Sequence, residues 1–281
     1  MLPSQFNGHS WPERRPDVAG LLSRIWQSFG KTSKPLGEDA RVPDGLRVYA
    51  IGDIHGRSDL LRDLHERIRN DAQSCGTVDK SIIYLGDYVD RGLDSKGVID
   101  TLLTPLEGFE CIHLKGNHED TLLRYLDDYT MGMRWFPIGG DATVMSYGVR
   151  LPKGLSAKER EAHMWSEFQA NLPDDHLSFF SELNLMHRIG DYAFVHAGVR
   201  PGTPIDQQNP TDLMWIRNSF LECKDDFGAV VVHGHSTARE PEIRRNRIGI
   251  DTGAYATNIL TCLVLEGTTR RFLTTGGGIP L

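Results

Sequence analysis

The chain has 281 residues, of which 39% are hydrophobic and 25% charged, and its formal net charge at pH 7 is −7. This composition is typical of a globular protein, and the length fits one large α/β domain with additions. The acidic balance argues against nucleic acid as a partner, because nucleic-acid binding needs a basic surface. We expect no membrane span, since no apolar run approaches the roughly 20 residues that a membrane helix needs. The N-terminus lacks a signal pattern, so we expect a cytoplasmic protein.

Residues 1–45 are predicted to form an N-terminal arm that precedes a catalytic domain over residues 46–281. Apolar residues recur at helical spacing from Asp17 to Gly30 and indicate a short amphipathic helix. Such a helix either packs on the domain surface or docks to a partner or a membrane surface. The four cysteines are far apart and form no C-x-x-C pair, which favours reduced thiols.

Three short apolar runs predict buried strands at Leu46 to Ile51, Ile82 to Leu85 and Cys111 to Leu114. Helical patterns follow each of them, after Ser58, from Ser95 to Leu103 and from Asp120 to Asp128. This β-α-β-α-β-α order predicts parallel pairing with right-handed crossovers. Each strand ends in a glycine-bounded polar motif, and ligands collect at the carboxyl ends of strands in open α/β sheets.

The rest of the chain divides into a helical and a β-rich part. Residues 130–185 are expected to form a helical cap region, with two helices between Ser156 and Leu183. The last third predicts five more strands, at Tyr192 to Val195, Ala229 to Val232, Arg247 to Asp251, Ile259 to Leu265 and Arg271 to Thr274.

The polar residues at the strand ends suit a dinuclear metal site. Two cations about 3.5–4 Å apart need a bridging carboxylate, further oxygen or imidazole ligands and open positions. Carboxylate, amide and imidazole donors without thiolate favour manganese, iron or zinc over a structural cysteine-type zinc. A single histidine at a strand end is more often a satisfied core residue, so the interpretation depends on all the motifs together. The donors are Asp53, His55, Asp87, Asn117, His196 and His235.

The motifs resemble those of the phosphoprotein phosphatase family of metallophosphoesterases, in its bacterial serine/threonine protein phosphatase branch. The matching sequences are GDIHG at Gly52, GDYVDRG at Gly86, GNHE at Gly116, HAG at His196 and HGH at His233. The resemblance implies a calcineurin-like metallophosphoesterase fold of α/β class. That fold has a central β-sandwich of mixed sheets flanked by helices, with the metal site at the carboxyl ends of strands.

The resemblance also assigns roles. Asp53, His55 and Asp87 would hold one divalent metal, and Asp87 would bridge to a second metal. Asn117, His196 and His235 would complete that second site. His118 resembles the acid that protonates the leaving oxygen, and Asp90 the carboxylate that orients it. Arg91 and Arg217 resemble the arginines that grip the phosphate.

These roles predict a metal-dependent phosphomonoester hydrolase in which a metal-bridging hydroxide attacks phosphorus in line. The two cations are expected to be Mn²⁺, with iron or zinc as alternatives. The expected substrates are phosphorylated proteins or peptides, carrying phosphoserine, phosphothreonine or also phosphotyrosine, and small phosphoesters. The sequence indicates no oligomeric state.

Two other functions remain open at this point. The first is a dinucleoside polyphosphate hydrolase that cleaves diadenosine tetraphosphate. Hydrolases of this family that cleave symmetrically typically carry alanine at the position of Asp90, so the aspartate favours the protein phosphatase, although some hydrolases of mixed specificity share it. The second is a non-catalytic interaction protein, which the complete set of ligand positions disfavours.

Overall fold

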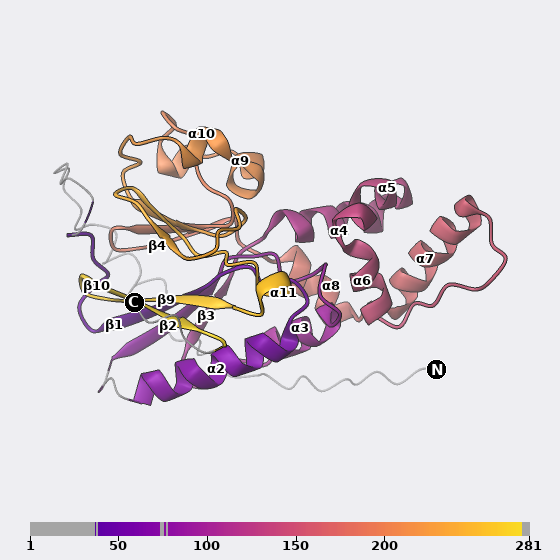
Figure 1. The fold of residues 1–281 in the computed structure, drawn as a ribbon, viewed down its shortest axis with the longest axis horizontal. Helices are drawn as coiled ribbons and strands as arrows, with labels where there is room; N and C mark the ends of the chain where they lie inside the picture. Colours follow the sequence, from indigo (N-terminus) through magenta and orange to yellow (C-terminus); the bar gives the residue numbers. More distant parts are fainter. Residues whose placement is uncertain (1–36, 38, 74–75, 77, 277–281) are drawn as a thin grey trace, which may run out of the picture. The chain divides into compact units, whose positions relative to one another are not determined.

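The computed structural model describes residues 37, 39–73, 76 and 78–276. The predicted helix from Asp17 to Gly30 lies outside these residues. The described part is built on two five-stranded sheets, with helices on the outer face of each (Figure 1). None of its helices combines the length and apolarity that a membrane crossing needs.

The first sheet has the strand order β10-β9-β1-β2-β3. Strands β1, β2 and β3 run parallel to one another, as predicted. Strand β9 pairs antiparallel with β1, and β10 pairs antiparallel with β9. Helix α2 connects β1 to β2, and helix α3 connects β2 to β3. The bounds are β1 Leu46–Ile51, α2 Ser58–Gln73, β2 Asp79–Tyr84, α3 Ser95–Leu102, β3 Glu110–His113, β9 Thr261–Glu266 and β10 Thr269–Thr274.

The second sheet has the order β4-β5-β6-β8-β7. Strands β5, β6 and β8 are parallel, whereas the edge strands β4 and β7 are antiparallel to their neighbours. Both sheets are therefore mixed, and the predicted fold class is confirmed. The bounds are β4 Met186–Ile189, β5 Tyr192–Val195, β6 Val230–His233, β7 Glu242–Ile243 and β8 Arg247–Gly249.

Alternating side chains divide the structure into four layers. In β1, Val48 and Ala50 pack against the second sheet, while Tyr49 and Ile51 pack beneath α2. In β6, Val232 faces the first sheet and Val231 packs with residues of α9 (Pro210–Trp215) and α10 (Asn218–Leu221). Figure 1 shows α2 and α3 outside the first sheet and α9 and α10 outside the second. Three buried apolar interfaces thus hold the strand ends in fixed positions.

The helices between β3 and β4 pack mainly on one another and on the helical side of the first sheet. Their aromatic core contains Trp135, Tyr125, Phe168 and Phe180, all with almost no solvent exposure. The bounds are α4 Asn117–Asp127, η1 Tyr129–Met131, α5 Gly132–Trp135, η2 Phe136–Ile138, α6 Gly140–Ser146, α7 Ala157–Asn171 and α8 Asp174–Ser181. The short elements η3 Ile205–Gln207 and α11 Ala254–Thr257 lie in later loops.

Several boundaries differ from expectation; strand β2, for example, begins at Asp79, three residues before the predicted Ile82. Helix α4 begins at Asn117, three residues before the predicted Asp120, because the Glu119 carboxylate accepts a hydrogen bond from the Gly116 amide (2.9 Å) at the helix start. Residues 39–45, expected to belong to the arm, contact the sheets. Ala40 and Val42 are buried, and the Val42 amide donates to the Gly267 carbonyl (3.0 Å).

Candidate metal centre

The loops after five strands converge at one edge of the two sheets. Every residue predicted to hold metal is less than a tenth exposed, although the loops come from both sheets. Asp53 and His55 follow β1, Asp87 follows β2, Asn117 begins α4 after β3, His196 follows β5, and His235 follows β6.

Asp87 lies at the middle of this convergence. Its Oδ2 is 3.6 Å from His55 Nε2 and 3.8 Å from His118 Nε2. Its Oδ1 is 3.3 Å from His196 Nε2. Two donor groups capable of holding a metal ion share this carboxylate, one with His55 and His118 and the other with His196 and His235. A carboxylate shared between two adjacent sites is what a dinuclear centre needs.

The remaining predicted ligands join the second group and the space beside it. The Asn117 side-chain oxygen is 2.9 Å from His196 Nε2 and 2.8 Å from His235 Nδ1. Both Asp53 carboxylate oxygens accept a hydrogen bond from the His235 backbone amide, at 3.2 and 3.0 Å. The structure therefore brings all six residues together. In the donor group of His55 and Asp87, however, the third member is His118, whereas Asp53 accepts hydrogen bonds from the His235 backbone amide.

Two histidine nitrogens of this cluster are available to bind a metal ion. His55 Nδ1 donates to the Val89 carbonyl (2.8 Å), so Nε2 carries the lone pair, and this buried nitrogen has no hydrogen-bond partner among the described residues. His235 Nε2 is also buried and without a partner there. A carbonyl that fixes the second ring nitrogen is the usual support of a metal-ligating histidine. Burial lowers the pKa of His55 to about 3, which keeps the ring neutral and able to bind metal.

The carboxylates also favour a cation in this space. Burial, and then the neighbouring charges of Asp251 and Asp87, raise the pKa of Asp53 well above its ordinary value. Burial alone would lower the pKa of His196, but Asp87 outweighs it and raises this pKa to about 10. Both shifts include the effect of nearby buried carboxylates, and a positive charge among these carboxylates lowers the energy.

The backbone at the centre is strained. Five non-glycine residues of the site have positive φ, namely His55 (46°), Asp87 (51°), Asp90 (74°), Arg91 (66°) and His235 (59°). Outside the site, Asn258 is the only other such residue in the described part of the chain. Left-handed backbone in side-chain-bearing residues is unfavourable and collects at functional sites, where the surrounding structure holds it in place.

Two glycines make room for the ligand carboxylates. A Cβ at Gly116 would lie 2.1 Å from Asp87 Oδ1, and a Cβ at Gly234 would lie 2.0 Å from Asp53 Oδ1. Neither distance is possible for a side chain, so the ligand carboxylates can occupy these positions only because both residues lack one.

Glu119 holds the loop that carries Asp87. Its buried carboxylate accepts hydrogen bonds from the backbone amides of Asp87 (2.9 Å), Tyr88 (2.7 Å) and Val89 (3.3 Å), as well as from Gly116. Sequence reasoning included this residue in a motif but gave it no role. Its side chain joins the loop after β2 to the start of α4.

His118 and Asp90 form a buried pair beside Asp87. His118 Nδ1 is 2.5 Å from Asp90 Oδ2, and His118 Nε2 points towards the centre. Burial alone would lower the pKa of His118, but the charge of Asp87 and the bond to Asp90 raise it above its ordinary value. Asp90 is itself fixed by hydrogen bonds from Trp135 Nε1 (2.7 Å) and Thr143 Oγ1 (2.6 Å). The sequence carried no signal for these last two residues.

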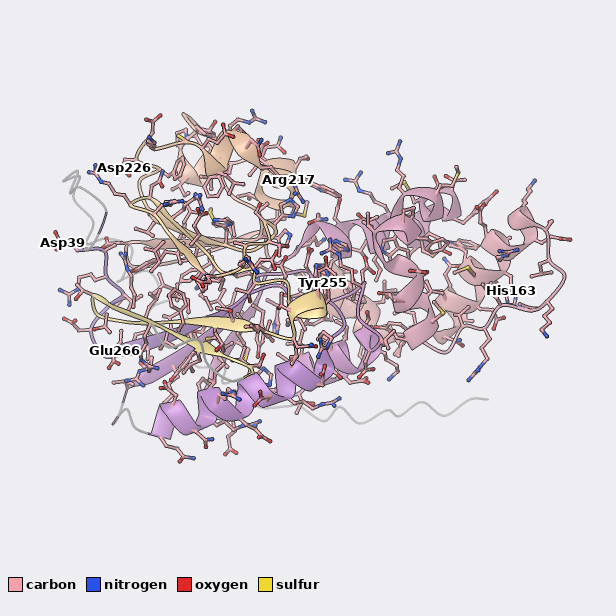
Figure 2. All side chains as sticks on the ribbon, viewed as in Figure 1. Asp39, His163, Arg217, Asp226, Tyr255 and Glu266 are labelled. Carbon is pink, nitrogen blue, oxygen red and sulfur yellow. The ribbon has the colours of Figure 1, made fainter. Side chains whose placement is uncertain are left out.

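The two predicted phosphate-binding arginines differ in how firmly they are held. Arg91 lies 3.4 Å from His118 Nε2, and its guanidinium is 4.7 Å from the centre of the Tyr255 ring. Arg217 is exposed, in the segment after α9 (Figure 2). Burial first, then the charge of His196 and more weakly that of Arg217, lower the pKa of His235 to about 3. Tyr255 had not been predicted, because nothing in its sequence context marks it.

Several proteins similar to this chain are described as tetraphosphatases or phosphatases. An asymmetrical bis(5'-nucleosyl)-tetraphosphatase of Halalkalibacterium halodurans is 26% identical over 231 residues, covering 78% of this chain and 89% of the relative. The crystal structure of a candidate diadenosine tetraphosphatase has a TM-score of 0.55 at 21% identity, covering 83% of this chain and 95% of the other. A cold-active protein tyrosine phosphatase has a TM-score of 0.52 at 16% identity, covering 84% and 82%.

The two structures share the fold of this chain. A sequence profile described as calcineurin-like phosphoesterase matches residues 46–257, from the first strand to the end of α11. The match spans every residue of the predicted site. The chain therefore belongs to the calcineurin-like phosphoesterase family, whose members are metal-dependent hydrolases.

Proposed function

We propose that this chain hydrolyses the phosphoanhydride bonds of dinucleoside polyphosphates such as diadenosine tetraphosphate. The observation that carries hydrolysis is the buried Asp87 carboxylate shared by two metal-binding donor groups, beside the His118–Asp90 pair. The substrate class is supported by the asymmetrical bis(5'-nucleosyl)-tetraphosphatase that is similar over 89% of its length. Sequence motifs alone favoured a protein phosphatase. The aspartate at position 90 disfavours only the symmetrically cleaving hydrolases, which typically carry alanine there, and this relative is an asymmetrical enzyme.

Bound divalent cations would neutralise phosphate charge and lower the pKa of water, which makes water nucleophilic at neutral pH. Asp53, His55, Asp87, Asn117, His196 and His235 would hold them. Arg91 binds a phosphate oxygen and is kept in position by the Tyr255 ring. His118 Nε2 holds the proton for the leaving oxygen, and Asp90, bonded to Nδ1, keeps the ring in the orientation that presents it.

A protein phosphatase is the second candidate, and the short His118–Asp90 contact favours it. An alkoxide from serine or threonine leaves poorly and needs a proton, whereas a phosphate leaving group is already a weak base and needs that proton less. An acid held by a hydrogen bond to the buried Asp90 is therefore most useful for a phosphomonoester of an alcohol. Phosphorylated proteins or peptides are the substrates of this second candidate.

One substrate panel separates the two. We compare kcat/KM for diadenosine tetraphosphate with that for phosphoserine, phosphothreonine and phosphotyrosine peptides, all in Mn²⁺ and again after chelation. We expect the dinucleotide to be the best substrate and all turnover to disappear in the chelator, with recovery on adding Mn²⁺. A higher kcat/KM on any phosphopeptide would replace the first candidate by the second. Full activity in metal-stripped protein would exclude both.

A further inference from the structure

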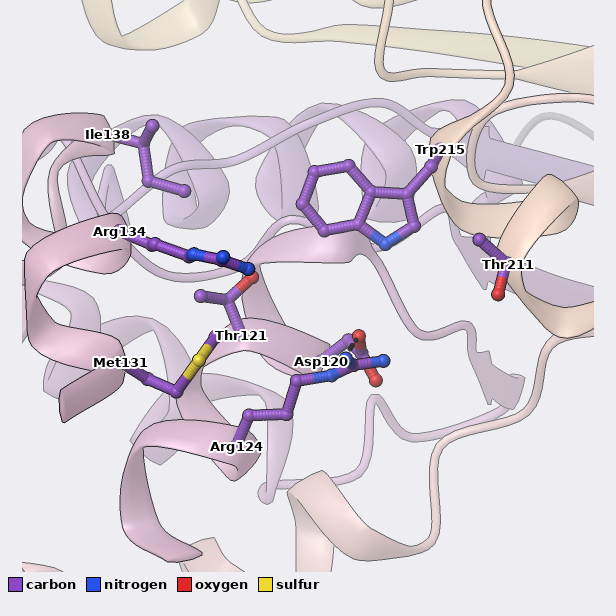
Figure 3. Close-up of a pocket in the computed structure, with 8 residues that line it drawn as sticks. All are labelled: Asp120, Thr121, Arg124, Met131, Arg134, Ile138, Thr211 and Trp215. Atoms are coloured by element: carbon purple, nitrogen blue, oxygen red, sulfur yellow. Dashed lines mark ion pairs between the residues drawn. The ribbon is translucent and has the colours of Figure 1, made fainter. Parts of the chain in front are cut away.

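A hollow of about 480 Å³ lies between the helical region and the second sheet's outer helices. Its volume falls within the range of about 300–1,000 Å³ typical of small-molecule sites. Figure 3 shows the indole of Trp215 from α9 on one side and Arg134 from α5 on the other, with α4 forming the floor. The lining residues are Asp120, Thr121, Arg124, Met131, Arg134, Ile138, Thr211 and Trp215.

This hollow adjoins the metal centre on two sides. The Trp215 ring is 6.5 Å from the ring of His235, edge to face. Thr121 donates its hydroxyl hydrogen to the Asn117 carbonyl (2.7 Å), and so connects the floor of the hollow to a proposed ligand. Two of the residues that line the hollow therefore contact proposed metal ligands.

The lining combines a flat apolar surface with positive charge. Trp215 is 41% exposed, so its large aromatic side chain lines the hollow and is accessible there. Arg124 is paired with Asp120 at 2.9 Å, whereas Arg134 has no ion pair or hydrogen bond among the described residues. Two guanidiniums and one carboxylate leave one positive charge on the hollow, although the whole chain carries −7.

We propose that this hollow is the subsite for one nucleoside of the substrate and the phosphate next to it, on the side of the centre where Trp215 lies. The base would stack on Trp215, and Arg134 would bind the anionic oxygens that follow it. The inference rests on the proposed function and specifies how that site would recognise a dinucleotide.

A nucleotide fits the lining better than a peptide side chain does. An apolar peptide side chain on Trp215 would leave the Arg134 charge without a partner beside it, and an acidic one would leave the indole uncovered. A base linked to a phosphate satisfies both through one covalently connected ligand, and every base offers a face for stacking.

The test uses variants at the two ends of the hollow. Arg134→Gln removes the unpaired charge, and Trp215→Leu removes the stacking surface, which Trp215→Phe retains. Arg160→Gln, at an exposed arginine of α7, is the control for an equal change in net charge. For each we measure kcat/KM for diadenosine tetraphosphate relative to kcat/KM for para-nitrophenyl phosphate, which has no nucleoside.

We expect this ratio to fall about tenfold or more in Arg134→Gln and Trp215→Leu, in line with what one stacked base contributes. Trp215→Phe should recover most of it, and Arg160→Gln should keep the ratio of the unmodified chain. A second measurement needs no dinucleotide cleavage. AMP should inhibit turnover of para-nitrophenyl phosphate more strongly than inorganic phosphate does, and Arg134→Gln should remove that advantage.

The two measurements distinguish the failure of each proposal. If the unmodified chain cleaves no dinucleotide, but its preference for AMP over phosphate depends on Arg134 and Trp215, the proposed function is wrong and the nucleotide subsite stands. If it cleaves the dinucleotide and both variants keep the unmodified ratio, the function stands and the subsite is overturned. A loss in Arg134→Gln that affects phosphopeptides and spares the dinucleotide would overturn it as well.

Discussion

Asp90 links the helices between β3 and β4 to the candidate metal centre. It lies in the loop after β2, yet its carboxylate is fixed by Trp135 from α5 and Thr143 from α6, more than 40 residues further along the chain. With no exposure to solvent, this carboxylate is stable only because each of its oxygens is hydrogen-bonded. The orientation of His118 therefore depends on helices that carry no predicted ligand.

The first prediction concerns His118 as an acid. His118→Asn should slow a phosphoserine peptide by about 10²–10⁴-fold, because an alkoxide needs the proton that the imidazole supplies. The loss on para-nitrophenyl phosphate should be much smaller, since its phenolate leaves without help. Paired kcat values on the two substrates check this, with Mn²⁺ binding measured to show that the centre is intact. Equal losses on both substrates would speak against the acid role.

A second prediction concerns Tyr255 as a positioning residue. Its ring lies under the Arg91 guanidinium, and a cation–π contact at an exposed site is worth about 0.5–1 kcal/mol. Tyr255→Leu should therefore raise KM for para-nitrophenyl phosphate by about two- to fivefold and leave kcat nearly unchanged, whereas Tyr255→Phe should keep KM. Steady-state kinetics decide the matter, and an unchanged KM in Tyr255→Leu would show that Arg91 needs no such support.

Motif reasoning located the residues at the strand ends because glycine-bounded polar clusters after apolar runs are local in sequence. It could not find Tyr255, Trp135 or Thr143, since each contributes one side chain from a segment with no pattern of its own. Only the folded chain shows that they contact Arg91 or Asp90. Glu119 belongs to one of the motifs, but its role depends on hydrogen bonds from four backbone amides in two different loops. Such hydrogen bonds cannot be inferred from the sequence.

At the scale of elements, the strand-end loops are shaped by glycine as much as by their ligands. Gly116→Ala would place a Cβ 2.1 Å from Asp87 Oδ1 and must displace that carboxylate. We expect Mn²⁺ affinity to fall by about 10–100-fold, as when other supports of a metal ligand are lost. Equilibrium dialysis on folded protein measures this.

Gly76→Ala is the matched control, because a Cβ there meets nothing within 4 Å among the described residues and the backbone needs no positive φ. Both variants should give circular dichroism spectra like that of the unmodified chain. Unchanged Mn²⁺ binding in Gly116→Ala would mean that Asp87 does not need the position in which the structure shows it.

The alternation of strands and helices predicted the parallel order of β1, β2 and β3, because each crossover carried a clear helical pattern. Strands β4 and β7 had not been predicted. Strand β7 has two residues, and β4 has one exposed and three partly exposed residues of mixed polarity, so neither carries an apolar alternation. Such edge strands form because they pair with an adjacent strand of the folded sheet, and local sequence does not show that pairing.

At the scale of the whole molecule, folding brings carboxylates together that repel one another without a cation. Adding Mn²⁺ at about 100 times its Kd should stabilise the fold by about 2.7 kcal/mol and raise Tm by about 5–10 °C. Thermal unfolding with and without Mn²⁺ measures the shift. In Asp87→Asn the shift should largely disappear, because the shared ligand is weakened, and an equal shift in that variant would place the bound ion elsewhere.

The boundary of the catalytic domain can be tested by two truncations. Deleting residues 1–36 removes none of the proposed ligands, so kcat on para-nitrophenyl phosphate should stay within about twofold of the full chain, a change of under about 0.5 kcal/mol in the barrier.

Deleting residues 1–42 also removes the buried side chains of Ala40 and Val42 and the backbone bonds to Gly267 and Asp191. Burying one valine contributes about 1.5–3 kcal/mol, so Tm should fall in the longer deletion relative to the shorter one. Equal Tm values would mean that residues 37–42 contribute nothing to the fold, and a folded but inactive shorter deletion would give the N-terminal arm a part in turnover.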